Sequence, residues 1–167
     1  DYLDRGGYFE STSLSSEDLN RSKYYADNSQ RDAAQQTFDS YGDFLLSLDM
    51  VAEIKAFSPV YLERITQLTN KTNQFNVTTK RYSLGDISSI SNSDKYIALY
   101  GKLSDRFGDN GLVSVVVASI EGSTCTIDLW LMSCRVLKRD MEYAMLDKLV
   151  NQCIACGVRE IIGVYVP

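Results

Sequence analysis

Residues 96–132 of this 167-residue chain read YIALYGKLSDRFGDNGLVSVVVASIEGSTCTIDLWLM, and the prediction of the fold class starts from them. Two runs rich in strand-forming residues, 96–103 and 112–118, flank Gly108-Asp109-Asn110-Gly111. Those four residues can adopt positive φ angles, so they predict a hairpin turn. A third run, 125–132, follows after a short turn. The pattern therefore predicts three consecutive antiparallel strands.

The segments on either side of these strands alternate between strand and helix. Residues 50–57 are expected to form a strand, followed by helices over 59–69, which opens with a proline, and over 84–90. An apolar stripe predicts the strongest helix at 138–155, and a crossover then places a last strand, 160–166, parallel to its neighbour. The expected fold is α+β, with a mixed, mainly antiparallel sheet flanked by helices.

The first third of the chain is polar. Ser15 and Asp18 fit a capping box, which predicts a helix starting near Ser16. A second short helix is expected at about 38–48. We therefore expect residues 1–48 to form a helical linker and residues 49–167 to form the main domain.

Composition excludes several classes of function. The chain has 17 Lys and Arg against 22 Asp and Glu, a formal net charge of -5, and no histidine. Without an imidazole, Ser-His-Asp and Cys-His mechanisms and His-ligated metal centres are excluded. The negative charge disfavours nucleic acid and anionic lipid as partners. Any catalysis must use carboxylates, thiols, amines or backbone dipoles.

The apolar and cysteine content bear on the compartment. The most apolar run, 111–120, is interrupted by serines and is too short to cross a membrane. Four cysteines are too few for a disulfide scaffold in a domain of this size. We therefore expect reduced thiols and a cytoplasmic protein.

Three separated segments resemble the FkbH-like proteins of the HAD superfamily, subfamily IIIC. They are KTNQFNVTTKRY at 71–82, DRFGDNG at 105–111 and DLWLMSCRVL at 128–137. In that family a HAD-type phosphatase domain precedes a GNAT-like, acyl-CoA N-acyltransferase-like domain. The resemblance implies that 1–48 is the tail of the phosphatase domain, and that 49–167 is a GNAT-like domain lacking its last helix and strands.

The resemblance also implies a function in polyketide biosynthesis. FkbH-like proteins take a glyceryl group from 1,3-bisphosphoglycerate, remove phosphate and deliver the acyl unit to an acyl carrier protein, towards methoxymalonyl-type extender units. The implied partners are that carrier protein and the N-terminal HAD-type domain of the same polypeptide. The phosphatase signature Asp-x-Asp is absent from this sequence, so the chain is expected to carry only the acyltransferase half.

Two alternatives to catalysis on a carrier protein remain open. One is a non-catalytic docking module with a degenerate GNAT fold, which would hold an acidic carrier protein through basic side chains. The other is a coenzyme A-dependent N-acetyltransferase. The basic side chains in question are Lys71, Lys80, Arg81, Arg135, Lys138 and Arg139.

The expected phosphate loop departs from the family pattern Arg-Val-Leu-Gly-Arg-Gly. Residues 135–140 place Lys138 and Asp140 at its two glycine positions. We expect the loss of both glycines to reduce backbone freedom and Asp140 to repel an anion, which disfavours ordinary coenzyme A. Lys138 and Arg139 can still meet the single phosphate of a phosphopantetheine arm. We therefore expect no tightly bound cofactor and no metal.

Two residues are candidates for catalysis. Cys134 lies between a strand and a helix beside Arg135, and cationic neighbours favour a thiolate that could carry the acyl group; alternatively it is a buried thiol that fills space. Asp128 alternates with Trp130 and Met132, so it could be a general base in a partly buried cleft, or it could pair with a cation.

Further residues are candidates for binding. The amides of Asn73, Gln74 and Asn76 can bind pantetheine or a hydroxylated acyl group, or can cap their own loop. Arg106 with Asp109-Asn110 can line the acyl site, or can form a hairpin ion pair and turn. The Cys153-Ile154-Ala155-Cys156 motif lacks a second cysteine pair and a histidine, so it predicts helix packing and not a zinc site.

Overall fold

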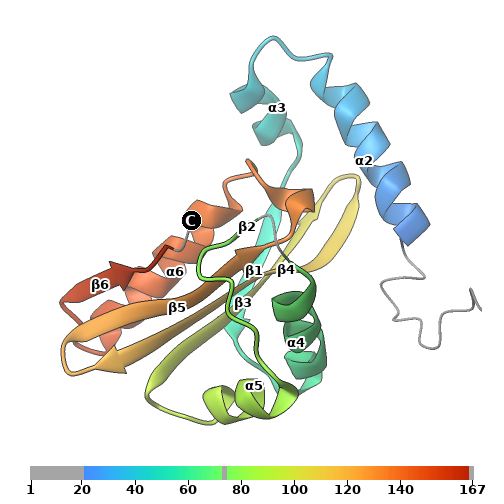
Figure 1. Cartoon of the computed structure of the whole chain (residues 1–167). Coiled ribbons are helices and arrows are strands. Elements are labelled where there is room, and N and C mark those ends of the chain that lie inside the picture. Colours follow the sequence, from blue (N-terminus) through green and yellow to red (C-terminus); the bar gives the residue numbers. More distant parts are fainter. Residues whose placement is uncertain (1–20, 73–74, 166–167) are drawn as a thin grey trace, which may run out of the picture. The chain divides into compact units, whose positions relative to one another are not determined.

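The computed structural model describes residues 21–72 and 75–165 (Figure 1). The helix predicted near Ser16, as well as Asn73 and Gln74, lies outside the described residues. The chain divides into two compact units, 1–44 and 45–167. The first contains α2 (Arg21–Gln35) and the start of α3 (Tyr41–Ser47).

The second unit is built on a sheet whose described strands follow the order β1-β3-β4-β5-β2, with β6 also paired to β5. Every pairing is antiparallel except the parallel pair β5–β6. The predicted run of three antiparallel strands and the parallel last strand are therefore confirmed. The strands are β1 (Val51–Ala56), β2 (Phe75–Asn76), β3 (Tyr96–Asp105), β4 (Gly108–Glu121), β5 (Thr124–Met132) and β6 (Glu160–Gly163).

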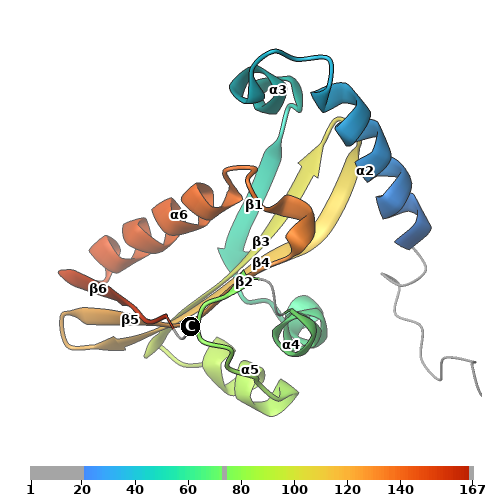
Figure 2. The ribbon, with the colours of Figure 1, turned by 45° about the horizontal axis from the view of Figure 1, so that its top comes forward.

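Helices cover both faces of this sheet (Figure 2). One face carries α4 (Leu62–Lys71), which follows a 3-10 turn at Pro59–Tyr61, and α5 (Leu84–Ser91). The other face carries α6 (Met141–Ala155). The central strand β4 is consequently buried on both faces, which explains why its sequence reads as a nearly continuous apolar run.

Two turns differ from the prediction. The β3–β4 turn lies three residues earlier than expected, because the Asp105 carboxylate accepts hydrogen bonds from the amides of Phe107 (2.9 Å) and Gly108 (3.1 Å). Gly111 does have a positive φ, of 68°, but it lies inside β4, at an irregularity of the β3–β4 register. Strand β2 was not predicted at all.

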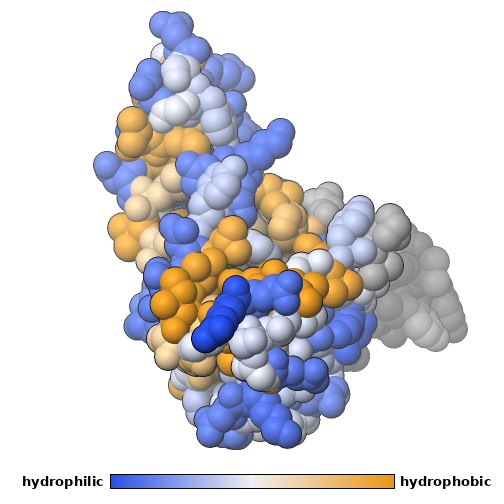
Figure 3. Space-filling model, turned by 90° about the vertical axis from the view of Figure 1, so that its left-hand side faces the viewer, coloured by the Kyte–Doolittle hydropathy of each residue, from blue (hydrophilic) through white to orange (hydrophobic). Residues whose placement is uncertain are grey.

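Strand β6 lies at one side of the sheet and is mostly exposed. Apolar side chains gather on the side of the molecule that Figure 3 shows. The exposed apolar side chains of the described residues include Leu146 and Ile154 of α6 and Ile162 of β6. In the part of the chain that the structure describes, no helix has the length and hydrophobicity needed to cross a bilayer.

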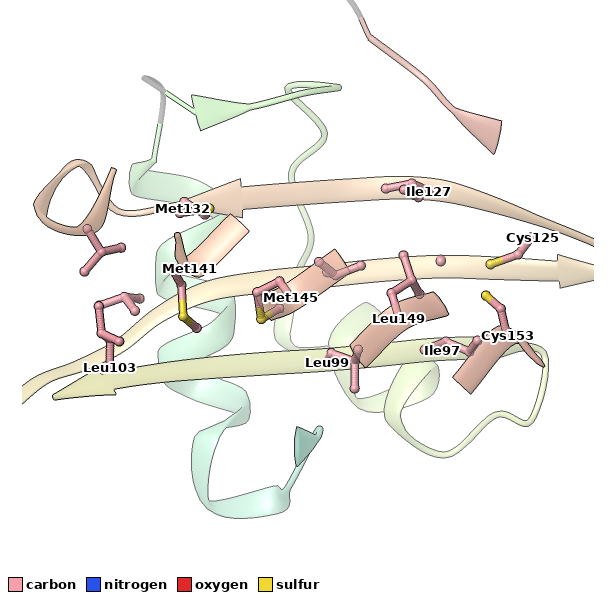
Figure 4. Close-up of a cluster of buried hydrophobic side chains, with 14 of the residues drawn as sticks. Ile97, Leu99, Leu103, Cys125, Ile127, Met132, Met141, Met145, Leu149 and Cys153 are labelled. Carbon is pink, nitrogen blue, oxygen red and sulfur yellow. The ribbon is translucent and has the colours of Figure 1, made fainter. Parts of the chain in front are cut away.

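Helix α6 packs closely on the sheet at Gly101 of β3. A Cβ atom at Gly101 would come within 2.7 Å of Met145 Sδ and would also collide with Met141 Cε. Both methionines are buried in the core between α6 and the sheet (Figure 4). Only glycine allows this close approach.

Replacement of Gly101 with valine should therefore destabilise the protein. We expect Gly101→Val to lower the free energy of unfolding by about 1–3 kcal/mol, because the buried methionines must leave their positions. Urea denaturation measures this. The control is Gly163→Val, whose Cβ atom would meet nothing within 4 Å; an equal loss in both variants would contradict the close packing.

Candidate functional site

A register shift interrupts the pairing of β5 with β4 at Asp128. Val117 pairs with Leu129, whereas the next residue, Ala118, pairs with Ile127, so Asp128 is the extra residue of a bulge. The bulge changes which side chains share a face: Ile127 and Met132 both belong to the core beneath α6. The strand from Leu129 to Met132 keeps a regular pairing with β4, so Trp130 and Met132 alternate as predicted and both contact this core.

The Asp128 carboxylate is held by an ion pair and further hydrogen bonds. Lys80 Nζ lies 2.9 Å from Asp128 Oδ1, and Ser119 also donates to this carboxylate. Burial by itself would raise the pKa of Asp128, but the hydrogen bonds from Lys80 and Ser119 outweigh it and place that pKa below its ordinary value. The hydrogen bond to Asp128 raises the pKa of Lys80. A carboxylate held in this way is a weak proton acceptor.

Residues 75–80, which we call the β2 segment, run along the last part of β5. Phe75 pairs with Met132, the Val77 amide donates to the Trp130 carbonyl (3.1 Å), and Thr78 Oγ1 donates to the Asp128 carbonyl (2.7 Å). Strand β6 pairs only with the first part of β5, residues 124–127. The outer edge of β5 is thus shared by two segments, with the bulge between them.

Asn76 is buried in the β2 segment. Its Oδ1 accepts a hydrogen bond from the Thr79 amide (3.0 Å), as in a self-capped loop. Its Nδ2 is buried without a hydrogen-bond partner. Among the described residues, the oxygen of this amide thus has a hydrogen bond within its own loop and the nitrogen has none.

Cys134 and Arg135 lie on the 3-10 turn η2 (Cys134–Val136), directly after β5. The amide of Ser133 donates to the Val113 carbonyl (2.7 Å), which fixes the start of this turn on the sheet. Arg135 Nε donates to Ser133 Oγ (3.2 Å). Cys134 is exposed, so a buried, space-filling thiol does not describe it.

The loop before α6 keeps an unusual backbone. Lys138 has a φ of 65° and Asp140 a φ of 59°, both in the left-handed region that normally favours glycine. These are the two positions where the resemblance predicts glycine. The left-handed conformation is thus present at both positions, although neither residue is glycine. Asp140 precedes α6 without making a side-chain cap.

Arg139, between these two left-handed residues, anchors the loop. Its guanidinium lies 3.2 Å from the carboxylate of Asp105, whose side chain is fully buried, while that of Arg139 is 13% exposed. Asp105 also caps the β3–β4 turn. A single carboxylate thus joins the hairpin turn to the loop before α6.

The remaining hairpin candidates have different surroundings. Arg106 lies over the ring of its neighbour Phe107, 4.8 Å from the ring centroid. Asp109 Oδ1 accepts from the Gly111 amide (2.7 Å), so it stabilises the bend at Gly111. Asn110 is buried, and its Nδ2 has no hydrogen-bond partner.

Two of the three segments that carry the sequence resemblance pair with each other, and the third is bonded to the loop that follows them. Residues 75–80 pair with β5 from Met132 to Asp128, and the hairpin turn is bonded to the loop before α6 through Asp105 and Arg139. The sequence analysis predicted neither the pair between Lys80 and Asp128 nor the pair between Asp105 and Arg139. Lys80 and Asp128 are 48 residues apart and show no common pattern, whereas the order Asp-x-x-Gly at 105–108 is a turn signal that identifies Asp105.

The donor set does not suggest a metal centre. Among the residues that the structure describes, no three cysteine or carboxylate side chains lie close enough together to hold a metal ion. The chemistry that this region offers is an exposed thiol, a left-handed loop and the N-terminus of a 15-residue helix.

Comparison with known proteins shows the fold. No family model matches the chain, and no curated protein matches its sequence significantly. Solved structures do match. The ribosomal-protein-S18-alanine N-acetyltransferase of Escherichia coli is 12% identical over 65% of this chain and 63% of that one, with a TM-score of 0.49; the chain thus spans less than two thirds of that protein.

Two further solved structures are more similar in shape. The AAC(6')-Iy complex with a bisubstrate analogue is 13% identical over 70% of this chain and 81% of that one, with a TM-score of 0.56. Glucosamine-6-phosphate N-acetyltransferase from Arabidopsis thaliana is 12% identical over 70% and 83%, with a TM-score of 0.52. These matches confirm the predicted GNAT-like fold class.

Loss of the Asp105 charge should destabilise the domain strongly. Asp105→Asn keeps an acceptor for the two turn amides but leaves the largely buried Arg139 charge without its partner, so we expect a loss of about 3 kcal/mol or more in the free energy of unfolding. Urea denaturation measures it. The control is Glu53→Gln in the exposed pair between Glu53 and Lys55, which should change stability little.

The Asp128 pair should make stability depend on acid pH. Because the folded-state pKa of Asp128 lies below its ordinary value of 3.8, its contribution is fully present above that value and is lost as the pH falls through the lower, folded-state pKa. Asp128→Asn should therefore be less stable than the wild type at neutral pH and approach it in acid, in urea titrations across this range. A difference in stability that stays constant with pH would contradict this linkage. So would an unchanged acid dependence of stability in Lys80→Met, which lacks the ion pair with Asp128.

Proposed function

We propose that this chain transfers acyl groups to the phosphopantetheine thiol of an acyl carrier protein, in the manner that the resemblance to FkbH-like proteins implies. One observation carries the proposal: an exposed thiol, Cys134, lies on the turn that leads from β5 to a left-handed loop and the N-terminus of α6. The GNAT-like fold supports acyl transfer as the general reaction class. We propose three further features from the resemblance: the glyceryl group as the acyl unit, an acyl carrier protein as the acceptor, and a HAD-type domain as the donor.

The loop before α6 supplies the phosphate site in this proposal. The amides of the first helical turn and the positive end of the helix dipole favour an anion. Left-handed residues in a loop turn successive amides towards a common centre, which also favours anions. Lys138 adds positive charge, and Arg139 positions the loop through Asp105. The carboxylate of Asp140 opposes a more highly charged ligand, so a single phosphate fits better than a pyrophosphate.

Cys134 carries the acyl group between donor and carrier. Its sulfur, after losing its proton to solvent, attacks the carbonyl carbon of the donor; a thioester forms on Cys134, and the donor's leaving group departs with the bonding electrons. The phosphopantetheine thiolate then attacks this thioester, and Cys134 leaves as a thiolate. Exchange between two thiols depends mainly on positioning and on stabilisation of the oxyanion, which is compatible with a chain that contains no histidine.

The arrangement of the three resemblance segments supports a common role. The KTNQFN segment runs into the β2 segment, whose Phe75 pairs with Met132, two residues before Cys134. The DRFGDNG segment anchors the loop before α6 through Asp105. In this proposal, Asn73, Gln74 and Asn76 bind the pantetheine amides, while the hairpin keeps the phosphate loop in place.

Coenzyme A-dependent N-acetylation is the second candidate, and a specific observation favours it. The left-handed backbone at Lys138 and Asp140 is retained although both glycines are absent. The fold neighbours are N-acetyltransferases, and a structure of AAC(6')-Iy was determined in complex with coenzyme A. We rank this candidate below transfer to a carrier protein because the carboxylate of Asp140 opposes the pyrophosphate of coenzyme A.

Docking without catalysis has less support. It depends on six basic side chains, of which Lys80 pairs with Asp128 and Arg139 with Asp105. Arg81 donates to the backbone carbonyls of Thr69 and Thr72, at the end of α4. Arg135 also donates to Ser133 Oγ, so at least four of these six basic side chains have intramolecular partners.

Thioester transfer through Cys134 can be tested by mass spectrometry. The protein is incubated with a glyceryl-pantetheine thioester, then with a holo acyl carrier protein. We expect a glyceryl adduct on Cys134 that the carrier discharges. Cys134→Ala should lose both adduct and transfer, whereas Cys156→Ala, a second exposed cysteine, should keep them.

Each other outcome contradicts the proposal in a defined way. Undiminished transfer by Cys134→Ala excludes the covalent role of Cys134. Carrier binding with neither adduct nor transfer indicates the docking module. Saturable binding of acetyl-coenzyme A, with acetyl transfer to an amine and none to the carrier, indicates the N-acetyltransferase.

A further inference from the structure

Two buried thiols face each other between α6 and the sheet. Cys125 lies at the start of β5 and Cys153 near the end of α6, and they are 0% and 2% exposed. Their sulfur atoms point towards one another (Figure 4), and both side chains belong to the same buried cluster. Burial and the neighbouring Cys153 raise the pKa of the Cys125 thiol to about 12. Neither group takes part in the proposed acyl transfer.

A third thiol lies at the surface beside this pair. Cys156 is exposed and follows Cys153 by three residues, at the end of α6. It is close enough to Cys125 to act on it electrostatically. The backbone here is held by hydrogen bonds from the Cys156 amide to the Gln152 carbonyl (3.0 Å) and from the Val158 amide to the Cys153 carbonyl (2.9 Å). Cys156 is therefore an exposed thiol three residues from Cys153, on the same end of α6.

We propose that Cys125 and Cys153 form a disulfide bond when the protein meets a low-molecular-weight disulfide such as oxidised glutathione, with Cys156 as the thiol that reacts first. The contact between the buried sulfurs provides the geometry for the final bond. The exposure of Cys156 provides the access that the buried pair lacks. This proposal is independent of the proposed function.

The reaction proceeds by three thiol–disulfide exchanges. The Cys156 thiolate attacks the small disulfide, so that a mixed disulfide forms and one small thiolate leaves. The Cys153 sulfur, after losing its proton to solvent, attacks Cys156 Sγ and releases the second small thiol. The Cys125 sulfur likewise loses its proton and attacks Cys153 Sγ, and Cys156 leaves as a thiolate. Overall, two protein thiols are oxidised, one small disulfide is reduced to two thiols, and Cys156 is regenerated.

The product would cross-link β5 to the last turns of α6. The closed loop contains η2, the loop before α6 and most of α6 itself. A cross-link of this kind restricts the unfolded chain and so stabilises the fold. The expected result of oxidation is a protein that melts at a higher temperature.

The experiment uses the native protein, an excess of oxidised glutathione, rapid alkylation of free thiols and peptide mass mapping. We expect a linked pair of peptides containing Cys125 and Cys153, free Cys156, and a rise in melting temperature that dithiothreitol reverses. Cys125→Ser and Cys153→Ser should lose the linked pair and the rise. Cys156→Ser should form the same link at least about tenfold more slowly, whereas Cys134→Ser should form it at the wild-type rate.

Two results would overturn the proposal. One is glutathione attached to Cys134 and Cys156 while Cys125 and Cys153 stay reduced. The other is a stable Cys153–Cys156 link in place of the Cys125–Cys153 link. Formation of the proposed link at an unchanged rate in Cys156→Ser would overturn the role of Cys156. Oxidation of the protein in urea serves as a positive control for the reactivity of all four cysteines.

Discussion

The buried ion pair between Asp105 and Arg139 is the interaction on which the proposed site depends. A fully buried carboxylate is stable only if its charge and its lone pairs are satisfied, and Asp105 meets this condition with one guanidinium and two turn amides. The same contacts define the hairpin turn and the course of the loop before α6. A feature of the β3–β4 hairpin therefore fixes the course of the loop that leads into α6.

Much of the fold could be predicted because it follows from local patterns. The strands β3, β4 and β5 read as strand-forming runs, and α6 shows a helical stripe in Met141, Met145, Leu149 and Cys153, all of which are buried. What the pattern does not contain is long-range pairing. Strand β2 exists because two residues pair with the end of β5, and such a short pairing has no periodicity to detect.

The candidate site shows the same limit. Cys134 and Arg135 could be placed at the end of β5, because the strand and the turn are local features. Asp128 could not be assigned, because its partner Lys80 is remote in sequence and its orientation depends on a bulge. The hairpin turn lies earlier than predicted because the side chain of Asp105 caps it, whereas the glycines at 108 and 111 indicate a later turn.

The left-handed backbone at Lys138 and Asp140 has a consequence for how such loops are recognised. A non-glycine residue in this region costs of order 1–3 kcal/mol, and it persists where surrounding contacts impose it. Here the anchor at Arg139 lies between the two strained residues. A loop can thus adopt this backbone conformation without the glycines that usually indicate it. A search for the glycine pattern would overlook a loop whose conformation depends on contacts with another segment.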